Sequence, residues 1–175
     1  MFRPTDKISV SPPDNFYFTD FDKNDKKEII QVIYEAHNEI YSADDNSTEA
    51  WKSGYEKDEI QEAVNRRYDL FGQTNTLHIS TLVKSNKNNE IAGVCIAGIY
   101  PDSPNYFSCI HQVSVRPQYR RRGIAESMML NSINKVNSIS PVVTLGVRVG
   151  NPAELLYNKV GFLGGPTSST IHYIK

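Results

Sequence analysis

The stretch VSVRPQYRRRGIA, residues 113–125, joins a strand pattern to a helix pattern through an arginine-rich loop. The strand ends at Val115, a proline-led turn follows, and a helix opens near Gly123. The first N–H groups of a helix lack intrahelical partners and carry the positive end of its dipole. With Gly123 and the small Ala125 allowing close approach, this helix start suits an anion such as phosphate. The loop also carries four arginines: Arg116, Arg120, Arg121 and Arg122.

The loop alone leaves a simpler interpretation open, because three arginines and a glycine also fit a solvated turn. Two other phosphate-binding patterns are excluded. The chain contains no GxxxxGK(S/T) sequence, and no GxGxxG follows its first predicted strand.

The segments after this loop predict further helices and strands. Apolar residues over 125–136 recur at helical spacing, and PVVTLGVRV (141–149) predicts a strand. A short helix should follow, with Asn151 as N-cap, Pro152 at its first position and Glu154 completing a capping box. Gly161 is the expected C-cap, and a last strand is expected over 170–175.

The segments before the loop begin with an extended lead-in, 1–15, which carries three prolines. A first strand is predicted at 16–19, followed by helices starting at Asp25 and at Asp58, which could cap the second helix. Three strands then follow in series, over 76–83, 91–100 and 106–115. A strand–helix–strand unit within a mostly antiparallel run predicts an α/β fold of the α+β type, with one mixed sheet.

Length and composition narrow the function. The 175 residues fit one domain, 1–175, and the net charge of -1 argues against a dedicated nucleic-acid binder. The longest apolar run, 91–100, is too short to span a bilayer, and the first residues lack a secretory signal. Cys95 and Cys109 form no disulfide framework, and the four histidines lack zinc-site spacing. We therefore expect a cytoplasmic protein that binds no metal, no membrane and no nucleic acid.

Two motifs resemble one known family. Arg120-x-x-Gly123-x-Ala125, preceded by Val113-x-Val115 and Pro117, resembles the acetyl-CoA-binding signature (Q/R)-x-x-G-x-(G/A) of the GNAT N-acetyltransferases. A later segment resembles the family's N-x-x-A…L-Y-x-K-x-G-F pattern, through Asn151-Pro152-Ala153, Leu156-Tyr157, Lys159 and Gly161-Phe162. The specific match spans residues 113–162, and the first half of the chain agrees in pattern only.

This resemblance implies a single-domain GNAT-like fold with about four helices, whose sheet is splayed between its fourth and fifth strands, 106–115 and 141–149. Acetyl-CoA would lie in the gap as cosubstrate, its pantetheine arm pairing with the backbone like an added strand. Asn151 has two roles available, a contact to the pantetheine or the helix cap alone. The expected cofactor-binding residues are Val113, Ser114, Val115, Arg120, Arg121, Arg122, Gly123, Ile124, Ala125 and Asn151.

The resemblance also implies two catalytic residues. Tyr157 matches the tyrosine that protonates the departing thiolate, although it also lies on an apolar helical face and could simply pack there. His111 is the candidate base, because its strand spacing places it on the face of Val113 and Val115, and arylalkylamine acetyltransferases carry a similar histidine. The alternative for His111 is a hydrogen-bonded residue beside the cleft. An oxyanion donor is expected from a backbone N–H near Val113.

The acceptor is expected to be a primary amine, either a small cation or an arylalkyl amine. Residues 35–62 hold nine acids and two bases, interleaved with Tyr41, Trp51 and Tyr55, which would attract an ammonium group. A solvated acidic loop is the alternative. Two other functions stay open: a non-catalytic acyl-CoA sensor, and a peptide or protein N-terminal acetyltransferase. A homodimer could form through an exposed strand at 170–174.

Overall fold

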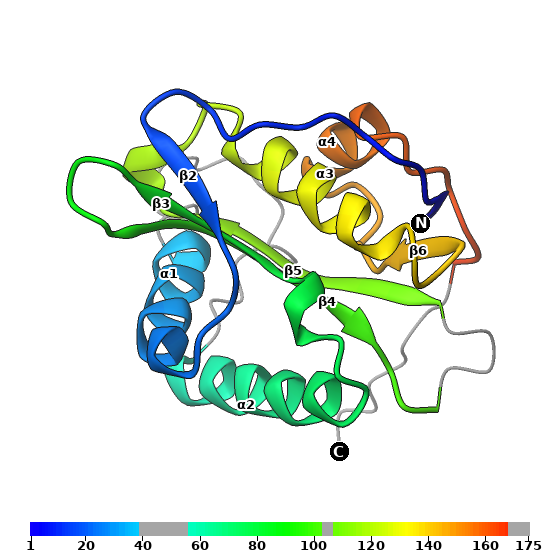
Figure 1. The fold of residues 1–175 in the computed structure, drawn as a ribbon, viewed down its shortest axis with the longest axis horizontal. Coiled ribbons are helices and arrows are strands. Elements are labelled where there is room, and N and C mark those ends of the chain that lie inside the picture. Colours follow the sequence, from blue (N-terminus) through cyan, green and yellow to red (C-terminus); the bar gives the residue numbers. More distant parts are fainter. Residues whose placement is uncertain (39–55, 103–106, 168–175) are drawn as a thin grey trace, which may run out of the picture.

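A computed structural model describes residues 1–38, 56–102 and 107–167, which form one mixed sheet (Figure 1). The strand order is β1-β6-β5-β4-β3-β2, with β5 and β6 parallel and every other neighbouring pair antiparallel. The predicted mixed, mostly antiparallel sheet is therefore confirmed. The strands are β1 (Phe2–Pro4), β2 (Phe16–Thr19), β3 (Thr81–Ser85), β4 (Ile91–Ile99), β5 (Ser108–Val115) and β6 (Val142–Leu145).

Helices cover both faces of this sheet. Figure 1 shows α1 and α2 on one side and α3 and α4 on the other. The central strand β4 is buried along its whole length, because its residues contact a hydrophobic cluster on either face. This explains the unbroken apolar run in its sequence. The α-helices are α1 (Lys26–Asn38), α2 (Lys57–Gln73), α3 (Ile124–Val136) and α4 (Ala153–Lys159). None of the described helices is long and apolar enough to cross a membrane.

The strand predicted over 141–149 ends at Leu145, and two further segments near the sheet differ from the prediction. Residues Phe2–Pro4, expected within an extended lead-in, form the edge strand β1, which pairs antiparallel with β6. The strand predicted over 76–83 begins only at Thr81, because Leu77–Ile79 forms a 3-10 helix that buries Ile79. In both segments the tertiary contacts decide the outcome, since sequence alternation is weak over so few residues.

The helix caps also differ in detail. The N-cap of α2 is Glu56 rather than Asp58, in a capping box with Glu59. The short helix α4 begins at Ala153, with Pro152 as N-cap. Asn151 still assists, because its Oδ1 accepts a hydrogen bond from the Ala153 N–H at 2.9 Å. The predicted capping box is wrong, because the Glu154 carboxylate accepts from the Gly150 N–H instead, at 3.0 Å.

The end of α4 lies one residue before its prediction, because the C-cap is Val160 rather than Gly161. Gly161 follows the helix with φ of 94°, a left-handed backbone that favours glycine after a helix. The predicted last strand, 170–175, lies outside the described residues.

The splayed sheet is confirmed by the pairing of β5 with β6. Their parallel register runs only from Ser108↔Val143 to Ile110↔Leu145. Beyond Ile110, β5 continues for another five residues without a described neighbour on this side. The two strands therefore separate along the part of β5 that carries the expected cofactor-binding backbone.

Both cysteines carry free thiols inside the sheet layer. Cys95 on β4 is fully buried, and burial raises the pKa of its thiol to about 11. Burial also raises the pKa of the Cys109 thiol on β5. Neither thiol is significantly ionised at neutral pH.

A substitution at Gly98 tests the packing of α2 against β4. A Cβ there would overlap the ring of Phe71, which is fully buried. We expect Gly98→Ala to lower the free energy of unfolding by about 1–3 kcal/mol, as overpacking commonly does. Thermal unfolding measures the loss, with Gly72→Ala as the control because its Cβ would meet no atom within 4 Å. Equal stability of the two variants would contradict the prediction.

Candidate functional site

An irregularity in β5 lies where the sheet splays. Ile96 of β4 pairs with Gln112, but the next residue, Ala97, pairs with Ile110, so His111 is an extra residue on β5. Such a β-bulge interrupts the alternation of side chains. As a result, the neighbours His111 and Gln112 both line one cavity, against the α1–α2 side of the sheet.

This bulge corrects one expectation about His111. The regular spacing predicted that His111 shares a face with Val113 and Val115, and this prediction is wrong. Both valines pack against the cluster on the α3 side, whereas the His111 ring lies 5.6 Å from that of Phe71 in the α1–α2 cluster. The bulge carries the imidazole to the opposite side of the strand.

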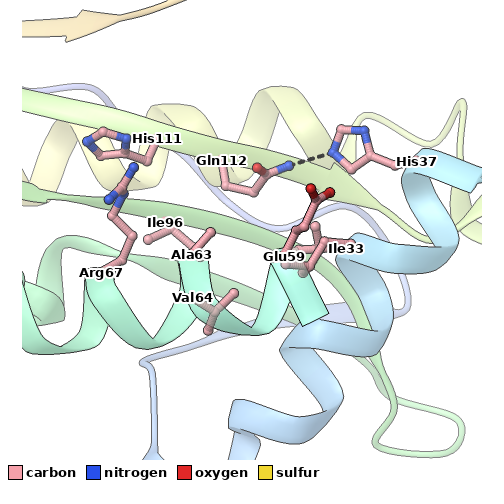
Figure 2. A pocket seen from close by; sticks show the side chains of 10 residues that line it. Ile33, His37, Glu59, Ala63, Val64, Arg67, Ile96, His111 and Gln112 are labelled. Carbon is pink, nitrogen blue, oxygen red and sulfur yellow. Dashed lines mark hydrogen bonds between the residues drawn. The ribbon is translucent and has the colours of Figure 1, made fainter. Parts of the chain in front are cut away.

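The cavity has a volume of about 400 Å³ and is lined by residues of α1, α2, β4 and β5. Its walls are mainly apolar, and its polar groups come from α1, α2 and β5. Figure 2 shows the Arg67 guanidinium pointing toward His111, with Glu59 near Gln112 and His37. The lining residues are Ile33, His37, Glu59, Ile60, Ala63, Val64, Arg67, Ile96, His111 and Gln112.

His111 is packed in an aromatic corner of the cavity. Its ring lies edge-on to Tyr100 at 4.9 Å, and the Tyr100 hydroxyl is 3.4 Å from Nδ1. The other nitrogen, Nε2, is buried and has no hydrogen-bond partner among the described residues. Burial and the Arg67 charge lower the pKa of His111 to about 4, so the imidazole is neutral at pH 7. A buried, neutral nitrogen without a partner is suited to contact a ligand.

A second imidazole, His37, lies at the end of α1. Its Nε2 is 2.9 Å from Gln112 Nε2, which also donates to Ser114 Oγ at 2.8 Å. Because an amide nitrogen only donates, this network assigns His37 Nε2 as the acceptor and its proton to Nδ1. Burial and the Arg120 guanidinium lower the pKa of His37. Both imidazoles of the cavity are therefore held in the neutral form at pH 7.

The loop between β5 and α3 presents unused backbone donors. The N–H groups of Arg121 to Glu126 donate to none of the described residues, and the N-cap Gly123 provides no side-chain cap. Arg121 and Gly123 have φ of 60° and 75°, which turn the chain tightly into the helix. A Cβ at Gly123 would meet only Pro13, at 3.9 Å. This helix start has the form that binds a diphosphate.

The sequence suggested that the four arginines of the loop form one positively charged group. In the structure they do not act together. Arg116 is only 8% exposed, and its guanidinium forms ion pairs with Glu35 at 2.9 Å, Glu90 at 3.0 Å and Glu28 at 3.5 Å. Its Nε also donates to the Ile91 carbonyl at 2.8 Å. Arg116 is thus a buried structural cation rather than part of an anion site.

The other arginines divide into two kinds. The Arg120 guanidinium donates to the carbonyls of Ala36, at 2.8 Å, and of Val115, at 3.3 Å. Arg121 and Arg122 are exposed, and Arg122 lies over the Tyr119 ring at 5.8 Å. Only these last two leave their charge available to a ligand at the loop surface.

The remaining predicted cofactor residues lie along the splay or at the helix starts. Val113 and Val115 lie on the part of β5 that has no described neighbour on the β6 side, while the Ser114 hydroxyl is buried against Gln112. Ile124 is buried at the start of α3 and Ala125 is half-buried beside it. The Asn151 Oδ1 accepts from the Ala153 N–H at the start of α4, although the N-cap itself is Pro152. Contact of these residues with acetyl-CoA stays a prediction.

Tyr157 lies on the other side of the sheet from His111. It projects from α4 into the α3-side cluster, where its ring meets that of Phe162 at 6.4 Å. Burial raises the pKa of its hydroxyl, which hydrogen-bonds to no described residue. Tyr157 therefore packs against the α3-side cluster, as the simpler alternative expected. Its hydroxyl stays protonated at neutral pH, as a general acid requires.

Sequence reasoning included Glu59 in the acidic run over 35–62 but missed other residues of the cavity, among them Ala63 and Arg67. Glu59, Ala63 and Arg67 are spaced by four along α2, so one helical face carries an anion, a small residue and a cation into the site. This spacing is visible in the sequence, but the bulge that places His111 and Gln112 on the same side of β5 is not. The predicted acidic and aromatic residues between 39 and 55 lie outside the described residues.

The comparisons with known proteins agree with this geometry. Residues 30–162 match the sequence profile of the Acetyltransferase (GNAT) family, so the chain belongs to that family. This membership supports acetyl transfer from acetyl-CoA. No curated protein sequence matches the chain.

Three solved structures show the same fold at low sequence identity. A GCN5-related N-acetyltransferase from Sphaerobacter thermophilus aligns with TM-score 0.65 and 15% identity over 91% of this chain and 49% of its own, so the chain spans about half its length. The aminoglycoside N-acetyltransferase AAC(6')-Iy in complex with CoA has TM-score 0.59 and 14% identity, covering 91% and 94%. The ribosomal-protein-S18-alanine N-acetyltransferase from Escherichia coli has 0.61 and 14%, covering 86% and 79%.

The titration of His111 tests the electrostatics of the cavity. We expect its imidazole to protonate near pH 4, and Arg67→Gln to raise the pKa only part of the way to 6.5, because burial is the larger cause. Histidine NMR measures both pKa values, with His111→Asn for assignment and the exposed neighbour change Arg66→Gln as control. The folded state binds this proton less well than the unfolded chain, so stability should fall from pH 6.5 to 4. An unperturbed pKa would contradict this account.

Proposed function

We propose that this chain is an acetyl-CoA-dependent N-acetyltransferase that acetylates a primary amine, a small cation or an arylalkyl amine, by direct attack in a ternary complex. The observation that carries the proposal is the buried, unpartnered His111 Nε2 in a cavity beside the point where β5 leaves β6. A donor in the splay and an amine in the cavity would meet at this bulge.

The donor side is supported by two sets of backbone groups. The free edge of β5 from His111 to Val115 suits an amide-containing arm, which would pair as a short strand does. The unused N–H groups of Arg121 to Ala125 suit a diphosphate, with the exposed Arg121 and Arg122 adding charge. Strand and helix start are joined by one short loop, so a single extended ligand would contact both.

The acceptor side favours an amine with an apolar body. Ile33, Ile60, Val64 and Ile96 form apolar walls, and Tyr100 packs behind His111. An arylalkyl group would bury its surface against these walls at about 25 cal/mol per Å². Glu59 supplies an anion for the ammonium form, while Arg67 near His111 disfavours a second positive charge there. The amine would therefore lose its charge as it moves toward His111.

The reaction requires two proton transfers in addition to the exchange of bonds. The amine nitrogen forms a bond to the thioester carbonyl carbon, and the carbon–sulfur bond breaks to release CoA. His111, the candidate base, would accept a hydrogen bond from the amine through its neutral Nε2, and the proton would pass on to water, because burial and the Arg67 charge disfavour an imidazolium there. Tyr157 would donate its hydroxyl proton to the thiolate, which leaves as the free thiol. The proton released by the amine nitrogen passes to solvent, solvent returns a proton to the Tyr157 phenolate, and the products are the N-acetyl amine and CoA.

Ligand-induced stabilisation tests the donor site. We expect acetyl-CoA and CoA to raise the thermal unfolding midpoint by several degrees, because a ligand at 100 times its Kd adds about 2.7 kcal/mol. ATP is the control, since it carries phosphates without the pantetheine arm. No shift with acetyl-CoA or CoA, for a folded sample, would refute both the enzyme and the acyl-CoA sensor.

Loss of the Tyr157 hydroxyl tests the acid. We expect Tyr157→Phe to lower kcat roughly 10²-fold, within the usual range for general acid catalysis, while the acetyl-CoA thermal shift is unchanged. Tyr17→Phe is the matched control, because its hydroxyl bonds Asn89 at the far turn of the sheet. An unchanged kcat would leave Tyr157 a packing residue.

An acceptor panel separates the remaining functions. Thiol release from acetyl-CoA is followed with 2-phenylethylamine, spermidine and a short peptide with a free N-terminus. We expect 2-phenylethylamine to give the highest kcat/KM. Preference for the peptide would favour an N-terminal acetyltransferase, and CoA binding without turnover of any amine would favour the sensor.

A further inference from the structure

Two arginines attach the β5–α3 loop to the last turns of α1. Arg116 Nη1 contacts the Glu35 carboxylate at 2.9 Å, and Arg120 Nη2 donates to the Ala36 carbonyl at 2.8 Å. Their partners are consecutive residues of α1, and the next residue is His37. The loop whose N–H groups would bind acetyl-CoA is thus attached to the end of α1, which lines the cavity assigned to the amine.

The Arg120 guanidinium bridges two backbone carbonyls. One belongs to Val115 at the end of β5, and the other to Ala36, in the last turn of a helix that ends at Asn38. Carbonyls in a last turn lack intrahelical partners, and a cation there also opposes the negative end of the helix dipole. Arg120 therefore holds the end of α1 at a set position relative to β5.

This position decides where the His37 imidazole lies. Its Nε2 is 2.9 Å from the Gln112 amide, and Gln112 is itself fixed by the bulge and by Ser114 Oγ. If the last turn of α1 shifted, the His37–Gln112 contact would break and the cavity wall would open between α1 and β5. The Arg120 guanidinium is directed toward α1, on the side of the loop that faces the amine cavity, rather than toward the place proposed for acetyl-CoA.

We propose that Arg120 is a positioning residue for the acceptor: it fixes the last turn of α1 so that His37 stays against Gln112 as a wall of the amine site. This inference rests on the proposed function, because it assigns the cavity to the amine. The charged loop would thus serve both substrates: its backbone N–H groups would bind acetyl-CoA, and the Arg120 guanidinium would position the amine site.

Kinetics separate this role from cofactor binding. With 2-phenylethylamine, we expect Arg120→Gln to raise the amine KM roughly tenfold, as loss of a charged hydrogen bond commonly does, and to leave the KM for acetyl-CoA within twofold. Arg120→Lys keeps the charge and should recover part of the loss. Arg66→Gln, an exposed arginine on α2, is the control. A raised acetyl-CoA KM with an unchanged amine KM would overturn the proposal.

A titration of His37 gives a readout that needs no substrate. Within residues 1–38, 56–102 and 107–167, the charged and titratable groups near this imidazole are Arg120 on the loop, with Glu59, Arg67 and His111 lining the same cavity, and Glu35 lies two residues earlier on α1. Because the Arg120 charge disfavours the imidazolium, Arg120→Gln should raise the pKa of His37, and Arg120→Lys and Arg66→Gln should not. His37→Asn assigns the signal. An unchanged pKa in Arg120→Gln would overturn the coupling, even if no amine is a substrate.

A double-mutant cycle completes the test. If Arg120 acts through His37, the losses in amine kcat/KM of Arg120→Gln and His37→Asn should be non-additive, the double variant being little worse than the poorer single one. Fully additive losses would overturn the proposal. If no amine in the panel were acetylated, the proposed function would be refuted. The His37 titration would still test the coupling between Arg120 and His37.

Discussion

The single extra residue in β5 is the constraint on which the site depends. A strand that kept its register with β4 would place His111 and Gln112 on opposite faces, and no cavity would hold both. The bulge also bends the strand, and β6 leaves its parallel neighbour at the residue just before it, Ile110. The bulge at His111 thus lies both where β5 separates from β6 and where His111 and Gln112 enter the cavity against α1 and α2.

The buried Arg116 stabilises the frame around that irregularity. Its guanidinium joins carboxylates from α1 and from the turn before β4, and it donates to the Ile91 carbonyl. Removing one partner from such a buried cluster leaves charge uncompensated, so the group acts as a unit. The charge of Arg116, which in the sequence looks like part of a ligand site, is used for folding, and the proposed anion site would depend instead on backbone N–H groups and exposed arginines.

Much of the fold could be predicted from the sequence, because its signals are local. The apolar run of β4, the periodicity of α1 and α3, and the arginine–glycine loop each carry their own pattern. What could not be predicted depends on distant partners. The edge strand β1 exists only because β6 offers it a neighbour, and the sequence around His111 contains nothing that marks an extra residue. The same limit explains why the loop position of Arg120 was predictable and its bond to Ala36 was not.

The burial of the two cysteines has a practical consequence for assays. Cys95 and Cys109 are both held as neutral thiols within the sheet, and thiol reagents react with the thiolate. A chromogenic disulfide should therefore report the CoA released in a turnover assay with little background from the folded protein. The same property makes the native chain a ready host for a single fluorophore, since a cysteine introduced at an exposed site would be labelled much faster than either native one.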